Sequence, residues 1–212
     1  MEAGILRIPF QASARVNLAL FDFDGTITDR ETFGAFIRFA TPPRRRVLGA
    51  PFFAPLVAGY RLGWVSGNAI RASVVRFGFR GLHADTVRQA GWHFAEKTLP
   101  AIVRPTALER IRWHQAQGDK VLVVSGALDV YLAPWCERQG LELICSRLQA
   151  ENGVLTGRFL GPQCVSAEKC RRVREVCAPE HFPTVYAYGD TREDFDMLAM
   201  AQRKFYRWQE VT

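Results

Sequence analysis

The sequence predicts an α/β protein whose core is a doubly wound parallel sheet, with an inserted helical cap and a β-hairpin. Three short apolar runs, each followed at once by polar residues, are typical of buried parallel strands, and helical patterns alternate with them. Strands that alternate with helices favour right-handed crossovers and a sheet with helices on its faces. In such sheets the ligand binds beyond the carboxyl ends of the strands.

The first strand is expected over 16–21, where a nearly continuous apolar run ends at Asp22. A helix is expected over 105–117, because a proline stands at its start and a glycine follows its end. The second strand is expected over 120–124 and ends at Ser125. Each strand therefore delivers a polar side chain to the same edge of the sheet.

The second half of the chain repeats this alternation after a hairpin. Asn152-Gly153 stands between two short runs and is a strong signal for a tight β-turn. A helix is expected over 166–176, with its first serine as the cap, and a third strand over 184–188. A last helix is expected over 192–201.

The middle of the sequence interrupts the alternation. Residues 30–100 contain several helical patterns but no convincing strand of a parallel sheet. We therefore expect a catalytic core made of 1–29 and 101–212, with 30–100 as a helical cap inserted after the first strand. Such a cap would cover the mouth of the crevice.

Composition limits the partners. The 212 residues carry a net charge of +7, with 48% hydrophobic and 23% charged residues, which is typical of a globular protein with anionic partners. The basic clusters at 44–46 and 171–174 lack the interleaved aromatic residues of single-strand binders, so no nucleic-acid partner is expected. Five cysteines without a C-x-x-C pair favour reduced thiols, and the N-terminus shows no secretory signal. A cytoplasmic location is the resulting prediction.

A pair of aspartates at the first strand end carries the most chemical information. Asp22 stands at the strand tip, where its carboxylate can attack phosphorus and form a covalent intermediate. Asp24, two residues on, can protonate the leaving alkoxide and then take a proton from the attacking water. The following Gly25 allows a tight turn that brings backbone amides close to phosphate oxygens.

Two carboxylates facing a phosphate require a cation, and Mg²⁺ suits carboxylate and phosphate oxygens. Asp190, at the third strand end, supplies a further ligand, and Asp194 can orient it or hold the metal's water shell. Ser125 and Gly126 can bind phosphate oxygens, and Lys169 can balance charge at phosphorus. Each feature alone is more often structural, but their joint occurrence at strand ends favours one catalytic site.

At these residues the sequence resembles the haloacid dehalogenase (HAD) superfamily, in particular its phosphoserine-phosphatase-like branch (subfamily IB). D-F-D-G-T at 22–26 resembles the first family motif and V-V-S-G at 123–126 the second. Lys169 resembles the third, and G-D-T-R-E-D at 189–194 the fourth. The resemblance implies a Rossmann-like core and Mg²⁺-dependent phosphatase activity.

The resemblance also implies roles for individual residues. Asp22 would be both nucleophile and metal ligand, and Asp24 the acid/base that also binds metal through its backbone carbonyl. Asp190 would bind Mg²⁺ with support from Asp194. The same serine and lysine would bind phosphate.

Two departures bear on the substrate. Ala127 stands where that branch has a second glycine, and Glu193 stands where it has asparagine. In favour of the branch, Glu31 stands where a glutamate binds the substrate amino group. The arginine for the substrate carboxylate would be Arg71 or Arg76, with Arg76 as the candidate.

The favoured function is hydrolysis of a small phosphorylated metabolite, such as phosphoserine, through an aspartyl-phosphate. The alternative is a membrane-associated lipid-phosphate phosphatase, because 32–38 resembles phosphatidylglycerophosphate phosphatases. The segment 47–65 carries one charge and follows the basic run 44–46, a pattern that also fits peripheral contact with an anionic membrane. Pro51 and Pro55 argue against a straight membrane-spanning helix, and burial of the segment in the cap is favoured.

Overall fold

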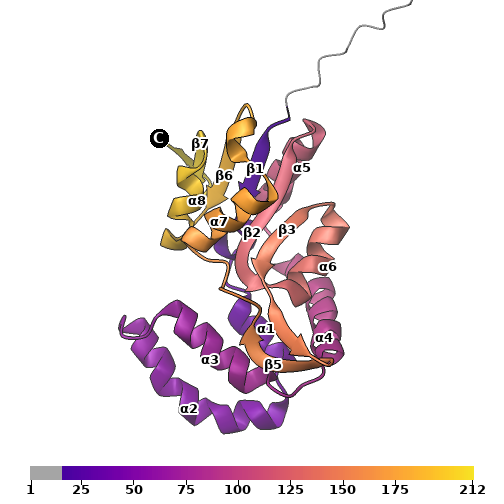
Figure 1. The fold of residues 1–212 in the computed structure, drawn as a ribbon, viewed down its shortest axis with the longest axis vertical. Coiled ribbons are helices and arrows are strands. Elements are labelled where there is room, and N and C mark those ends of the chain that lie inside the picture. The colour runs from indigo at the N-terminus through magenta and orange to yellow at the C-terminus, as the bar shows by residue number, and fades with distance from the viewer. Residues whose placement is uncertain (1–15) are drawn as a thin grey trace, which may run out of the picture.

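The computed structural model describes residues 16–212 as an open sheet covered by helices, with a helical insertion at one end (Figure 1). The sheet has six strands in the order β3-β2-β1-β6-β7-β8. Neighbouring strands run parallel, except β7 and β8, which are antiparallel. The predicted doubly wound parallel core is therefore confirmed. Its strands are β1 (Leu18–Phe21), β2 (Lys120–Leu128), β3 (Glu142–Ser146), β6 (Val185–Gly189), β7 (Arg203–Tyr206) and β8 (Gln209–Val211).

Alternate residues of the central strand β1 enter two apolar cores, one on each face of the sheet. Leu18 and Leu20 pack in the core that α7 and α8 cover. Ala19 and Phe21 pack in the larger core that α5 and α6 cover. Burial on both faces explains why this strand is apolar throughout. The helices of this part are α5 (Pro105–Ala116), α6 (Asp129–Gln139), α7 (Ala167–Val176) and α8 (Phe195–Ala199).

Several elements differ from the sequence-based expectations. The strands β3, β7 and β8 were not expected, and β7 carries charged residues. Ser166 stands at the start of α7, but its side chain makes no capping hydrogen bond. The last predicted helix is divided into a short turn, η4 (Arg192–Asp194), and α8.

Four helices follow the first strand, in the part of the chain where the sequence predicts a cap. The hairpin built on Asn152-Gly153 pairs apart from the main sheet and packs against α3, while α4 packs along α6 (Figure 1). The division at residues 30 and 100 stays a prediction, and residues 1–15, which it assigns to the core, lie outside the described residues. The elements are α1 (Phe33–Ala40), α2 (Pro43–Arg61), α3 (Gly67–Phe79), α4 (Ala84–Lys97), β4 (Leu148–Glu151) and β5 (Val154–Phe159).

The prediction that segment 47–65 forms buried cap core is wrong for much of its apolar surface. α2 packs against α3 along one side, where Gly49 approaches the ring of Phe77. Large side chains on its other sides are exposed, because no further element among residues 16–212 covers them. Val47 and Leu48 are each 74% exposed, and Trp64 beyond the helix is 82% exposed. Among residues 16–212, no helix is long and apolar enough to cross a membrane.

Candidate active site

The ends of three parallel strands bring the predicted site residues to one edge of the sheet. Phe21 of β1 is in register with Val123 of β2 and with Tyr188 of β6. Asp22 directly follows β1, and Asp190 directly follows β6. Residues far apart in the sequence therefore meet at one edge because the strand registers are matched.

Lys169 ties two of the carboxylates together. Its Nζ donates to Asp22 Oδ1 at 2.5 Å and to Asp194 Oδ1 at 2.6 Å, and all three side chains are almost completely buried. Burial alone would lower the pKa of Lys169, but the two carboxylates overcome this and raise it above its usual value. The lysine is therefore charged, and it compensates the negative charge of the site.

Asp194 organises the loop after β6. Its Oδ2 accepts hydrogen bonds from the backbone N–H of Asp190 at 3.1 Å and from the N–H and hydroxyl of Thr191, both at 3.0 Å. Burial raises the pKa of Asp194. Lys169 and these N–H donors lower it by more than burial raises it, so the net shift is downward. Gly189 is required here, because a Cβ at this position would lie 2.5 Å from Asp194 Cβ.

Three carboxylates lie close enough to surround a cation. Asp22, Asp190 and Asp194 each offer an oxygen, and these atoms lie within 4.8 Å of one another. Asp22 and Asp190 each keep one oxygen outside the hydrogen bonds of the described residues, since Lys169 and Thr26 bind only their Oδ1 atoms. Both oxygens of Asp194 are already used. An all-oxygen donor set of this kind fits Mg²⁺, with Asp194 in support of the ligands.

The carboxylate of Asp24 is held separately from this cluster. Its Oδ1 accepts from the N–H of Thr32 at 3.0 Å and from the hydroxyl of Thr32 at 2.5 Å. The hydroxyl of Tyr131 lies 2.9 Å from that of Thr32 and orients it. Burial, followed by the nearby charge of Glu31, raises the pKa of Asp24 to about 7. Sequence analysis did not identify the roles of Thr32 and Tyr131, because a threonine before a helix usually indicates only the N-cap of that helix.

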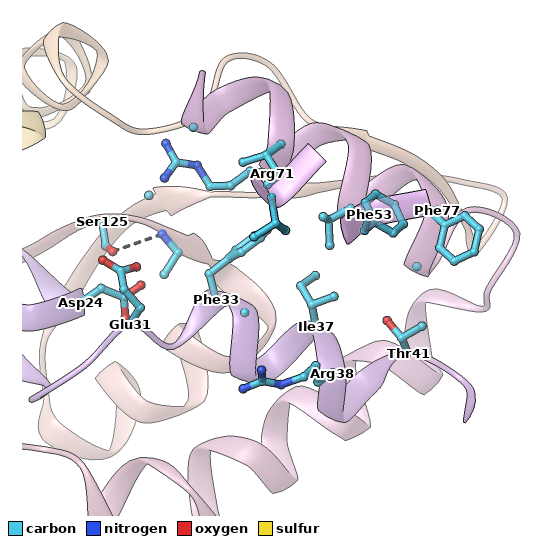
Figure 2. A pocket seen from close by; sticks show the side chains of 18 of the residues that line it. Asp24, Glu31, Phe33, Ile37, Arg38, Thr41, Phe53, Arg71, Phe77 and Ser125 are labelled. Atoms are coloured by element: carbon cyan, nitrogen blue, oxygen red, sulfur yellow. Dashed lines mark hydrogen bonds between the residues drawn. The ribbon is translucent and has the colours of Figure 1, made fainter. Parts of the chain in front are cut away.

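Ser125 lies in β2, close to Asp24 (Figure 2). Its Oγ accepts a hydrogen bond from the N–H of Ala127 at 3.2 Å, drawn as a dashed line in Figure 2. The hydroxyl hydrogen remains available to a phosphate oxygen. Ser125 and Gly126 both line a cavity at this edge of the sheet. A Cβ at Gly126 would lie 2.8 Å from the side chain of Val165.

A cavity of about 820 Å³ begins at these carboxylates and extends between α1, α2 and α3. Figure 2 shows its polar end at Asp24, Glu31 and Ser125, and its apolar end at Phe53 and Phe77. Most of the lining between these ends is apolar. The apolar lining residues are Phe33, Ile37, Phe53, Val57, Ile70, Val74 and Phe77.

The structure corrects the choice between the two candidate arginines. Arg71 lines this cavity, as does Glu31. Arg76 instead lines a second, smaller cavity beside Phe52 and Arg80. The two arginines lie five positions apart on α3, which turns their side chains about 140° from each other around the helix axis. The expected substrate role of Arg76 therefore does not fit its position.

Comparisons with known proteins agree with this architecture. Residues 19–199 match the family model described as haloacid dehalogenase-like hydrolase. The "Protein CicA" of Caulobacter vibrioides is 34% identical over 192 residues, which cover 90% of this chain and 85% of that protein.

Two further similarities concern phosphatases. A phosphoserine phosphatase of Albidiferax ferrireducens is 36% identical over 107 residues, which cover 46% of this chain and 44% of that protein. A substrate-bound phosphoserine phosphatase structure superposes with a TM-score of 0.66 at 22% identity, over 92% of this chain and 87% of the other. At that identity the superposition supports the fold.

Proposed function

This chain is a phosphatase of the haloacid dehalogenase-like hydrolase family, and we propose that it acts through an aspartyl-phosphate formed on Asp22 with the help of Mg²⁺. The observation that carries the proposal is the meeting of Asp22, Asp190 and Asp194, whose carboxylate oxygens lie within 4.8 Å of one another, with Lys169 bonded to Asp22.

The first half of the reaction uses Asp22 and Asp24. A carboxylate oxygen of Asp22 attacks phosphorus and forms a P–O bond, while the bond from phosphorus to the leaving oxygen breaks. Asp24 gives its proton to that oxygen, so an alcohol departs. In the second half, Asp24 takes a proton from water, which attacks phosphorus and releases inorganic phosphate and the Asp22 carboxylate.

The pKa values support this division of roles. A pKa of about 7 allows Asp24 to give and take a proton at neutral pH. Burial raises the pKa of Asp22 well above its usual range, although Lys169 opposes this. A bound Mg²⁺, held by Asp22, Asp190 and the carbonyl of Asp24, would supply positive charge that keeps Asp22 ionised and lets phosphate approach.

Hydrolysis of an aryl phosphate by the purified full-length protein tests the mechanism. We expect turnover that requires Mg²⁺, is abolished by EDTA and is lost in Asp22→Asn. The exposed Asp196→Asn on α8 is the matched control and should retain activity. Turnover by Asp22→Asn at the wild-type rate would refute the role of Asp22.

The cavity favours a second candidate for the substrate. A small metabolite such as phosphoserine fills only the polar end of a space of about 820 Å³. The apolar remainder, lined by residues such as Phe53, Val57 and Phe77, fits a leaving group with hydrocarbon chains. A lipid phosphate, the alternative raised by the sequence, is therefore supported over a small metabolite.

The outer surface of α2 supports the same substrate class. Arg44 and Arg46 are exposed at its start, beside the exposed Val47 and Leu48. Phe52 is exposed one turn further along the helix. Positive charges next to exposed apolar side chains match a bilayer with anionic headgroups. The protein would then remain in the cytoplasm as a peripheral membrane protein.

Sedimentation with vesicles tests the membrane contact. We expect binding to vesicles that contain phosphatidylglycerol, weaker binding to pure phosphatidylcholine, and loss of binding in Phe52→Glu. Phe195→Glu, at an exposed phenylalanine on α8, is the control and should bind like wild type. Absence of sedimentation with anionic vesicles at low salt would refute this candidate, and a screen of lipid phosphates against phosphorylated metabolites would then identify the substrate.

A further inference from the structure

Arg71 is a residue of the predicted cap that lines the cavity near its polar end. It projects from α3 (Figure 2), and its guanidinium is bonded to two side chains outside the cap. Its Nε donates to Gln163 Oε1 at 2.9 Å, and its Nη2 donates to Glu193 Oε1 at 3.1 Å. Nη2 also donates to Asn68 Oδ1 at 2.9 Å. Bonds to three side chains fix the position of this charge.

Arg71 and Lys169 are both bonded to carboxylates of the site. The cavity as a whole is lined by five carboxylates and five cations, and the other three cations, Arg38, Arg45 and Arg46, belong to α1 and α2. Lys169 is fully engaged with two of the carboxylates. Arg71 is paired with Glu193, and its side chain is only 18% exposed. Neither Lys169 nor Arg71 is therefore free to receive an anionic group without losing a carboxylate partner. The carboxylates are Asp22, Asp24, Glu31, Glu193 and Asp194.

Glu31 adds to this effect. Burial raises its pKa, and the charge of Asp190 raises it further, while Arg71 opposes both. A carboxylate on the substrate would have to displace Glu193 from Arg71 and would also face Glu31. An uncharged or cationic group at the same place does not have to displace Glu193 and is not repelled by Glu31.

We propose that Glu193 is a specificity-determining residue that excludes leaving groups with a carboxylate close to the phosphate ester. It does so by neutralising Arg71, the cation of α3 that lines the cavity and could receive such a group. This inference rests on the proposed phosphatase function for the identity of the site. It adds that the preferred leaving group is a neutral or cationic alcohol.

Phosphoserine and phosphoethanolamine provide a matched pair of ligands, because they differ only in the carboxylate. Binding of each to Asp22→Asn protein with Mg²⁺, measured by isothermal titration calorimetry, avoids turnover. We expect tighter binding of phosphoethanolamine. Adding Glu193→Gln should shift the affinity ratio toward phosphoserine by about tenfold, equivalent to about 1.4 kcal/mol. The same shift should appear in the kcat/KM ratio of the Glu193→Gln enzyme with Asp22 intact.

Two controls make the result specific. Adding Arg71→Met to Glu193→Gln should remove the gain for phosphoserine, because the freed cation is then absent. Glu137→Gln removes an equal charge from an exposed position on α6 and should leave the ratio unchanged. An unchanged ratio in Glu193→Gln, or a gain that survives Arg71→Met, would overturn the inference. Loss of Mg²⁺-dependent turnover in the wild type would instead overturn the proposed mechanism, and the binding ratio would still test Glu193.

Discussion

Replacing Lys169 with methionine tests whether the buried ammonium holds the catalytic carboxylates together. Its Nζ lies 2.5 Å from Asp22 Oδ1 and 2.6 Å from Asp194 Oδ1, with all three side chains at most 8% exposed. Methionine keeps much of the volume but removes the positive charge. Loss of one partner from a buried ion pair costs about 3–5 kcal/mol, because the other charge stays buried without compensation. We expect a loss of that size in the free energy of unfolding.

The assay is urea unfolding in EDTA, at about pH 7.5 and at about pH 5. The stability lost through Lys169→Met should be smaller at the lower pH. Without Lys169 the pKa values of Asp22 and Asp194 rise, so both groups take up protons in the folded variant and their repulsion decreases as pH falls. The control Lys97→Met, at an exposed position, should change stability by less than about 0.5 kcal/mol. A Lys169→Met protein as stable as wild type at neutral pH would refute the reasoning.

Three further predictions concern packing and protonation. Gly91→Ala should lower unfolding stability by about 1–3 kcal/mol in urea titrations, because a Cβ there would lie 2.1 Å from the carbonyl oxygen of Val130. Glu31→Gln should move the alkaline limb of the kcat/KM profile to lower pH, since losing a like charge lowers the pKa of Asp24 and deprotonates the acid earlier. Burial lowers the pKa of His114, so unfolding takes up a proton, and the stability of the wild-type protein should fall as pH drops below about 6.5. The His114→Gln variant should lack this pH dependence. Parallel curves of unfolding free energy against pH for the two proteins would contradict the prediction.

The core of the site could be predicted because parallel strands impose a simple geometry. Asp22, Ser125 and Asp190 each come at or near the end of a nearly continuous apolar run, and the carboxyl ends of parallel strands meet at one edge. Lys169 was different. A lysine in a helix is usually solvated, and its burial depends on how α7 packs on the sheet. The sequence could offer its charge as a balance at phosphorus, and the family resemblance supported that choice, but neither indicated that the side chain is buried.

The cap was harder to interpret because its sequence pattern does not specify which face is covered. α2 has apolar side chains around its whole circumference, so the same sequence is compatible with burial or exposure. The structure leaves Leu48 and Phe52 exposed, while Phe53 turns toward the cavity. The choice between Arg71 and Arg76 likewise depended on the rotation of α3. Sequence reasoning fixes neither rotation, because both depend on contacts between helices.

A buried network explains how the catalytic strands keep their relative register. Asp119, just before β2, accepts from the backbone N–H of Asn17, just before β1, at 3.1 Å. Its other oxygen lies 2.8 Å from His114 Nδ1, and His114 Nε2 lies 2.9 Å from the hydroxyl of Tyr188 in β6. The ring of Tyr188 stacks on Phe21 with centroids 4.2 Å apart.

This network therefore joins the three strands that carry the catalytic residues. A slip of one residue in either pairing would turn Asp22 or Asp190 to the opposite face of the sheet and separate the two. The partners are distant in sequence and belong to no catalytic motif, so their role could be recognised only in the folded chain. The carboxylates thus come together through the packing and pairing of the strands that carry them.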